Sequence, residues 1–166
     1  HTRLVSDWSS DVCSSDLSDI INAEPGQVVA TGLIEDNEQL IVSIGDGTPN
    51  PALEGTDSTI SFEVTLSNAA DQAVTVDYAT MNGTAIASQD YIADSGTLTF
   101  AAGETSKTIT ITVLNDDIFE DPDAFTVDIS NANAGGTSLT ISDSSGTGNI
   151  VDDDTIPVAS NDTNWA

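Results

Sequence analysis

Residues 58–66 read Ser58-Thr59-Ile60-Ser61-Phe62-Glu63-Val64-Thr65-Leu66. Apolar and polar residues alternate strictly along this stretch, with four apolar side chains at every second position. Successive side chains of a β-strand point to opposite faces, so the alternation places the apolar set on one face. The Thr and Ser residues between them favour strands and tolerate water. The stretch therefore predicts a strand with one buried face.

The same alternation recurs along the chain on both sides of this stretch, around Val42, Val76, Leu98 and Ile129. Turn signals such as Asn82-Gly83 separate the runs, and no window of eleven or more residues has helical periodicity. This pattern predicts an all-β fold, an antiparallel seven-stranded β-sandwich with an Ig-like Greek key. We expect six residues in its core: Ile60, Phe62, Val64, Ile111, Phe125 and Val127.

The composition is strongly acidic, with 28 Asp and Glu against 2 Lys and Arg in 166 residues, a formal net charge of −26. Such a chain repels nucleic acid and anionic lipid because it cannot neutralise phosphates, and it attracts divalent cations. No apolar run approaches the roughly 20 residues that a membrane helix needs. The one cysteine, Cys13, excludes an internal disulfide.

The first residues have the character of an artefact. Residues 7–17 read DWSSDVCSSDL, which resembles a translated sequencing adaptor. The alternative is a genuine Ser/Asp-rich loop with a free thiol. On the adaptor interpretation, residues 1–17 are disordered and carry no function, and they are excluded from fold reasoning.

A short motif occurs twice in the chain. Thr31-Gly32-Leu33-Ile34 and Thr147-Gly148-Asn149-Ile150 lie 116 residues apart, and each is followed by an acidic cluster. Tandem repeats produce this kind of internal similarity, although two short strings can also match by chance. We therefore predict a preceding repeat's tail over 18–38, one complete repeat over 39–154, and a linker or the start of the next repeat over 155–166.

Many of the acidic residues cluster between the predicted strands, above all in residues 115–123 and 152–154. Carboxylates that converge at a strand end repel one another unless a cation neutralises them. Calcium accepts six to eight hard oxygen ligands in flexible geometry, whereas zinc favours His and Cys. The alternative is an acidic rim that only keeps the protein soluble.

Residues 39–154 resemble a Calx-beta domain, a family that occurs in sodium–calcium exchangers and in bacterial adhesins. The resemblance rests on motifs spread over almost the whole repeat. They are Val76-Asp77-Tyr78-Ala79-Thr80, Gly83-Thr84-Ala85, Asp90-Tyr91, Gly96-Thr97-Leu98-Thr99-Phe100, Gly103-Glu104, Asn115-Asp116-Asp117-Ile118-Phe119-Glu120, Asp123-Ala124-Phe125 and Gly148-Asn149-Ile150-Val151-Asp152-Asp153-Asp154.

The resemblance implies calcium sites at one end of the sandwich. The implied ligands are Glu54, Asp90, Asp116, Asp117, the backbone carbonyl of Ile118, Glu120, Asp123, Asp152, Asp153 and Asp154. Two positions depart from the family pattern, because Asn115 stands where some members have Asp and Pro122 replaces an acid. Nine carboxylates at six to eight oxygens per ion, with sharing and water, suit roughly two to four calcium ions.

The sequence also favours a binding module over an enzyme, since residues 39–154 contain no His and no nucleophile or phosphate-loop motif. The leading hypothesis is a calcium-binding structural or adhesive repeat of a large secreted or cell-surface protein, membrane-associated and extracellular. Its partners would be calcium, neighbouring tandem repeats and a surface protein or glycan, with no nucleic acid. The alternatives are a calcium-sensing regulatory domain of a membrane transporter and a calcium-independent acidic spacer.

Overall fold

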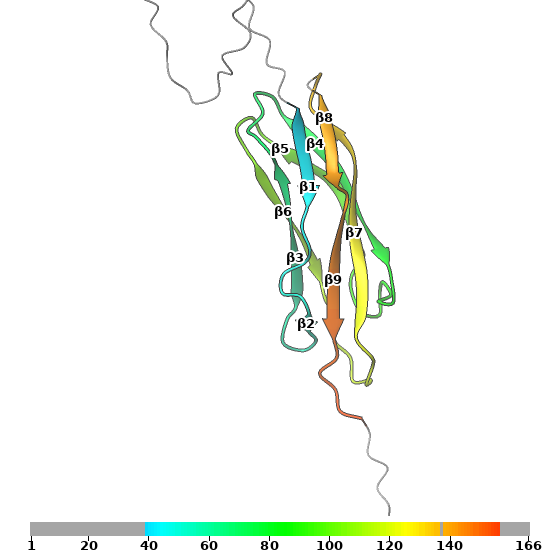
Figure 1. The fold of residues 1–166 in the computed structure, drawn as a ribbon. Coiled ribbons are helices and arrows are strands. Elements are labelled where there is room, and N and C mark those ends of the chain that lie inside the picture. Colours follow the sequence, from blue (N-terminus) through cyan, green and yellow to red (C-terminus); the bar gives the residue numbers. More distant parts are fainter. Residues whose placement is uncertain (1–38, 137, 157–166) are drawn as a thin grey trace, which may run out of the picture. The chain divides into compact units, whose positions relative to one another are not determined.

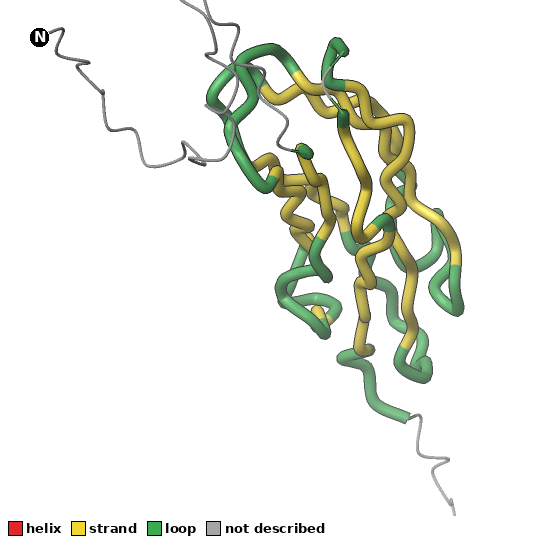
Figure 2. Tube along the Cα trace, turned by 45° about the horizontal axis from the view of Figure 1, so that its top comes forward, coloured by secondary structure: helices red, strands yellow, loops and turns green. Residues whose placement is uncertain are grey.

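Alternating apolar residues form the strands of a two-layered β-sandwich (Figures 1 and 2). The structure is a computed structural model, and it describes residues 39–136 and 138–156. Within these residues no helix is long and apolar enough to cross a membrane. The described residues form nine strands: β1 (Leu40–Ile44), β2 (Ala52–Leu53), β3 (Thr59–Leu66), β4 (Val74–Asn82), β5 (Ser95–Phe100), β6 (Ser106–Thr112), β7 (Asp123–Asn133), β8 (Leu139–Asp143) and β9 (Ser145–Val151).

The strands make two sheets, one in the order β6-β3-β1-β8 and the other in the order β2-β9-β7-β4-β5. The stretch over 58–66 becomes β3, which pairs antiparallel with β6 so that Phe62 lies opposite Ile109. In the second sheet β7 pairs antiparallel with both β4 and β9. The predicted all-β sandwich with an Ig-like Greek key is confirmed.

The strand count differs from the predicted seven because the first and last strands each divide between the two sheets. β1 belongs to one sheet and β2 to the other, and β8 and β9 divide in the same way. Two neighbouring pairs, β1 with β8 and β2 with β9, are parallel, so the sandwich is not purely antiparallel. The two segments that change sheets cross closely, since a Cβ on Gly146 would overlap the carbonyl oxygen of Gly45.

The core lies between the two sheets and contains the six residues that the alternation predicted. Ile60, Phe62, Val64, Ile111, Phe125 and Val127 are each at most 1% exposed. Phe125 lies at the centre of an aromatic group in which the ring of Tyr91 stacks on it at 4.2 Å and the ring of Phe62 meets it edge-on at 5.8 Å. This group supports the loops at one end of the sandwich.

Backbone hydrogen bonds join four segments in two pairs at that end. Glu54, directly after β2, donates its N–H to the carbonyl of Val151 at the end of β9 (3.0 Å). Leu114, after β6, donates to the carbonyl of Asp90 in the β4–β5 loop (2.9 Å). Figure 1 shows β9 ending beside β2 where the chain leaves the sandwich. The predictions for residues 1–38 and 157–166 lie outside the described residues.

Candidate metal centre

Loops from different parts of the chain bring carboxylates together beside the ends of β2 and β9. The side-chain Oδ2 of Asp90 accepts the Ile86 N–H at 2.6 Å, which holds this carboxylate within its own turn. Glu120 donates its backbone N–H to Asp152 Oδ2 at 2.8 Å, which joins the β6–β7 loop to the segment after β9. Backbone amides therefore hold the carboxylates of Asp90 and Asp152 in place.

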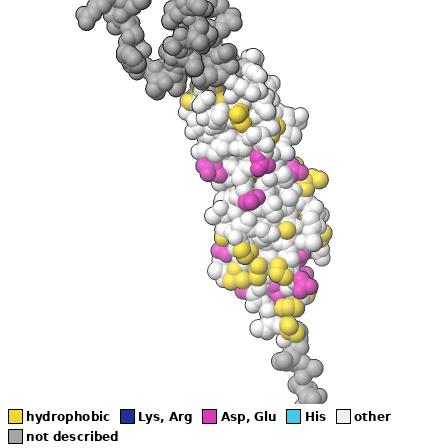
Figure 3. Space-filling model, viewed as in Figure 1, with side chains coloured by type: hydrophobic (Ala, Val, Ile, Leu, Met, Phe, Trp, Pro, Cys, Tyr) yellow, Lys and Arg dark blue, Asp and Glu magenta, His cyan; other side chains and the backbone are white. Residues whose placement is uncertain are grey.

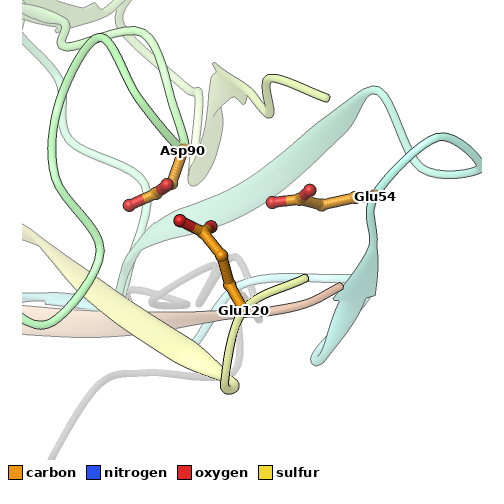
Figure 4. A group of neighbouring side chains, drawn as sticks. All are labelled: Glu54, Asp90 and Glu120. Carbon is orange, nitrogen blue, oxygen red and sulfur yellow. The ribbon is translucent and has the colours of Figure 1, made fainter. Parts of the chain in front are cut away.

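Glu54, Asp90 and Glu120 form the first group, and Figure 4 shows their carboxylates turned toward a common space. One carboxylate oxygen from each lies within 4.8 Å of those of the other two. Glu54 is 5% exposed and Asp90 is 7% exposed. Buried carboxylates at this separation repel strongly, so the arrangement favours a cation between them.

Asp152, Asp153 and Asp154 form the second group, whose carboxylate oxygens also lie within 4.8 Å of one another. Asp154 donates its backbone N–H to Asp152 Oδ1 at 2.8 Å, which ties the two ends of the group together. The Oδ2 atom of Asp154 is buried and has no hydrogen-bond partner among the described residues. Buried acceptors nearly always have a partner, and a bound cation would supply one.

Burial and mutual repulsion raise the pKa of Glu54 to about 7. Burial is the larger cause, followed by the negative charges of Glu120, Asp116, Asp152 and Asp90. A raised pKa means that the protein does not stabilise the ionised carboxylate by itself. A divalent cation would supply that stabilisation.

The same causes raise the pKa of Glu120 and the pKa of Asp154, again with burial first. The repelling charges on Glu120 include Asp123, and those on Asp154 include Asp153 and Asp117. Each of the nine predicted carboxylates belongs to one of the two groups or raises the pKa of a group member, and we call this set the acidic end. It comprises Glu54, Asp90, Asp116, Asp117, Glu120, Asp123, Asp152, Asp153 and Asp154.

Some of the predicted ligands are more exposed to solvent than Glu54 and Asp90 are. Asp116 and Asp117 are exposed, and Asp116 Oδ1 accepts the N–H of Ile118 at 2.7 Å. Ile118 itself is 63% exposed, and that amide hydrogen bond is the contact that the structure gives for its backbone. That the backbone carbonyl of Ile118 binds calcium stays a prediction.

Two residues beside the acidic end were not among the predicted ligands. Gly55 has a φ of +63°, and a Cβ there would lie 2.5 Å from Asp153 Oδ2 and 2.8 Å from Asn115 Oδ1. The missing side chain therefore lets Asp153 and Asn115 lie close against the backbone of Gly55. The Asn115 amide nitrogen donates to the Asp116 carbonyl at 3.1 Å. The sequence signals that could have identified these two residues are a glycine next to a candidate ligand and an amide side chain next to an acidic run.

The donor set fits calcium. It consists of hard oxygen atoms, and residues 39–156 contain neither His nor Cys to favour zinc. Lys107 is the one basic residue in this range, and it pairs with Glu104 at 2.8 Å on the β5–β6 side. Figure 3 shows acidic and apolar side chains side by side toward the end where β9 ends.

Comparisons with known proteins show which family and which relatives the chain resembles. The Calx-beta domain family model matches residues 32–154. The chain is 47% identical over 58 residues to sodium/calcium exchanger 1 of Canis lupus familiaris, which covers 35% of this chain and 6% of the exchanger. It is 45% identical over 60 residues to sodium/calcium exchanger 2 of Rattus norvegicus, which covers 36% of this chain and 6% of that protein. The chain thus spans a small part of these relatives.

Solved structures resemble the fold. The calcium binding domain CBD12 of CALX1.1 matches with a TM-score of 0.58 and 26% identity, covering 67% of this chain and 46% of that chain. The apo-form Calx CBD1 domain matches with a TM-score of 0.59 and 24% identity, covering 68% of this chain and 98% of that chain, and this likeness shows the fold alone.

Proposed function

The chain belongs to the Calx-beta domain family, and on that premise we propose that its acidic end binds calcium and that the domain acts as a non-catalytic calcium-responsive module. The observation that carries the proposal is the meeting of Glu54, Asp90 and Glu120, whose oxygens lie within 4.8 Å of one another although two of the three residues are buried. Three anions in such a space are costly without a cation.

Each group of acids would hold calcium in its own way. Glu54, Asp90 and Glu120 come from separate loops, so an ion between them would join those loops. Asp152, Asp153 and Asp154 are consecutive in the segment after β9, and Asp154 Oδ2, which has no hydrogen-bond partner among the described residues, offers a further ligand. Because Glu120 N–H is bonded to Asp152, binding at one group should strengthen the other. This donor set suits roughly two to four ions.

Within this class, we propose a calcium-sensing regulatory domain of a membrane-associated transporter. The support is that the curated relatives are sodium/calcium exchangers. This favours the transporter domain over the leading hypothesis of a secreted adhesive repeat. Since the chain spans only 6% of those relatives, the transporter itself is part of the proposal.

The second candidate is a structural repeat of an extracellular adhesive protein, in which calcium stiffens the joint to a neighbouring domain. Its support is the repeated Thr-Gly-x-Ile motif, together with the position of the acidic end where the chain continues past Val151. Both candidates include a neighbouring domain, and the match to the CBD12 structure of CALX1.1 supports one.

Calorimetric titration of the full chain with calcium separates the candidates. A sensor should bind with a Kd of roughly 10⁻⁷–10⁻⁵ M, and an extracellular structural module with roughly 10⁻⁴–10⁻³ M. Magnesium should substitute poorly, because it prefers tight octahedral geometry and keeps its waters. The absence of binding heat in either range would leave the calcium-independent acidic spacer as the better account.

A matched pair of variants locates the binding. Asp153→Asn removes one charge from the acidic end and should weaken calcium binding sharply. Asp128→Asn removes the same charge from β7, away from the acidic end, and should leave calcium binding unchanged. In the wild type, Asp128 accepts a hydrogen bond from the Ser145 hydroxyl at 2.6 Å. Equal losses in both variants would indicate diffuse attraction by net charge.

A further inference from the structure

Asn82 is the last residue of β4 and lies at the start of the loop that carries Asp90. Directly after it the chain packs closely against β7, since a Cβ on Gly83 would overlap the carbonyl oxygen of Ala124. The loop then returns toward Val113, with which Tyr91 forms a β-bridge. Asn82 thus stands where the loop leaves the rigid sheet.

One oxygen of Asn82 accepts two hydrogen bonds from this loop. The Tyr91 hydroxyl donates to Asn82 Oδ1 at 2.6 Å, and the Ala87 N–H donates to the same oxygen at 3.1 Å. The two donors flank Asp90 in the sequence, one before it and one directly after it. The side chain of Asn82 therefore closes the loop on both sides of this carboxylate.

The loop depends on such contacts because its own backbone is strained. Ser88 has a φ of +73°, a conformation that a non-glycine residue adopts at a cost. Tyr91 is fully buried with its ring stacked on Phe125, so its hydroxyl needs an acceptor inside the protein. Asn82 supplies that acceptor and fixes the direction from which Asp90 enters the acidic end.

We propose that Asn82 is a positioning residue for calcium binding, which acts through Asp90 and not as a ligand. The inference rests on the proposed function, because it concerns how the same site is kept ready. Groups that orient metal ligands commonly change metal affinity by tenfold to a hundredfold when they are removed. Asp90 is one of several ligands, so the lower end of this range applies.

The test is calcium titration of the full chain by calorimetry at a temperature well below melting. Asn82→Ala should weaken calcium binding about tenfold. Asn82→Asp should restore affinity to within about threefold of wild type, because a carboxylate oxygen accepts the same two hydrogen bonds. The matched control is Asn133→Ala, since Asn133 also ends a strand and accepts a backbone N–H, from Gly135 at 2.8 Å. It should bind calcium like wild type.

A double-mutant cycle shows whether the effect passes through Asp90. In the Asp90→Asn background, Asn82→Ala should change calcium affinity by less than about twofold, because the ligand that it positions is already impaired. A merely structural role would instead lower the melting temperature in chelator and leave the Kd of the folded protein unchanged. If Asn82→Ala does not fold, Tyr91→Phe replaces it, with a smaller but measurable loss of affinity expected.

The outcomes separate the two proposals. If the wild type binds calcium and Asn82→Ala binds it with the same Kd, this inference alone is overturned. The same holds for Tyr91→Phe where that variant replaces Asn82→Ala. An equal loss in the Asp90→Asn background would also overturn it. No calcium binding by the wild type would overturn the proposed function and this inference with it.

Discussion

Glu54 is a buried acid whose neighbours are other acids, and this combination sets the behaviour of the acidic end. Its pKa of about 7 places its ionisation in the neutral range instead of near 4.5. The sequence predicted Glu54 as a ligand only through the family resemblance. Its burial could not be predicted, because it depends on the pairing of β2 with β9 across nearly 100 residues of chain.

Replacing this carboxyl should have opposite effects with and without calcium. Glu54→Gln should stabilise the calcium-free protein at pH 8 by on the order of 3 kcal/mol, because it removes a buried charge whose pKa is raised to about 7. It should also weaken calcium binding. Urea unfolding in chelator measures the first effect, with Glu63→Gln on the exposed face of β3 as the control, expected within about 0.5 kcal/mol of wild type. A destabilised Glu54→Gln would show that the site needs no cation.

The calcium-free protein should lose stability as the pH rises from 5 to 8. Glu54, Glu120 and Asp154 have raised pKa values in the folded state, so the native protein binds more protons than the unfolded protein in this window. The lowered pKa values of Asp77 and Glu104 act in the opposite sense, but only below about pH 4.5.

Urea midpoints at pH 5 and pH 8 in chelator measure this slope, and saturating calcium should flatten or reverse it. A midpoint in chelator that rises with pH would contradict the electrostatic description of the acidic end.

The strands illustrate what a local pattern predicts and what it misses. Period-two alternation identified the buried face of β3, β6 and β7, because burial there follows directly from the pleat. The change of sheet within the first and last strands was not predicted, because it depends on contacts between segments about 100 residues apart. The close crossing at Gly45 and Gly146 is such a contact.

Two neighbouring glycines at this crossing should respond differently to alanine. Gly146→Ala should lower the free energy of unfolding by roughly 1–3 kcal/mol, because the added methyl would overlap the Gly45 carbonyl and lie 3.0 Å from the Phe62 ring. Gly45→Ala is the matched control, since its nearest contact would be an ordinary 3.8 Å to the Glu63 carbonyl. Denaturant unfolding measures both, and an equal effect in the two variants would contradict the close crossing.

At the scale of the whole domain, the acidic end lies where β2, β9 and the loops before β5 and β7 meet. The sequence predicted that nine acids would share one end, and the structure gathers six of them into two groups of three, with carboxylate oxygens within 4.8 Å of one another inside each group. That they hold calcium stays a prediction. The division into two groups, the tie between Glu120 and Asp152, and the role of Asn82 could not be predicted, because they depend on loop conformations that no periodic pattern encodes.

Calcium should stabilise the whole domain if it binds only the folded state. At a hundredfold excess of calcium over its Kd, the gain is about 2.7 kcal/mol per site, which corresponds to roughly 10 °C in Tm for a domain of this size. Melting followed by circular dichroism in calcium and in chelator measures the shift. Magnesium at the same concentration should give a much smaller one, and equal shifts would indicate general charge screening.

The most direct test of the central claim is a crystal structure of the full chain grown in millimolar calcium. Calcium ions should lie between Glu54, Asp90 and Glu120 and beside Asp152, Asp153 and Asp154, with carboxylate oxygens at about 2.3–2.6 Å from the metal. Asn82 should be hydrogen-bonded to Tyr91 and out of contact with any ion. An acidic end that holds only water in such crystals would contradict the account.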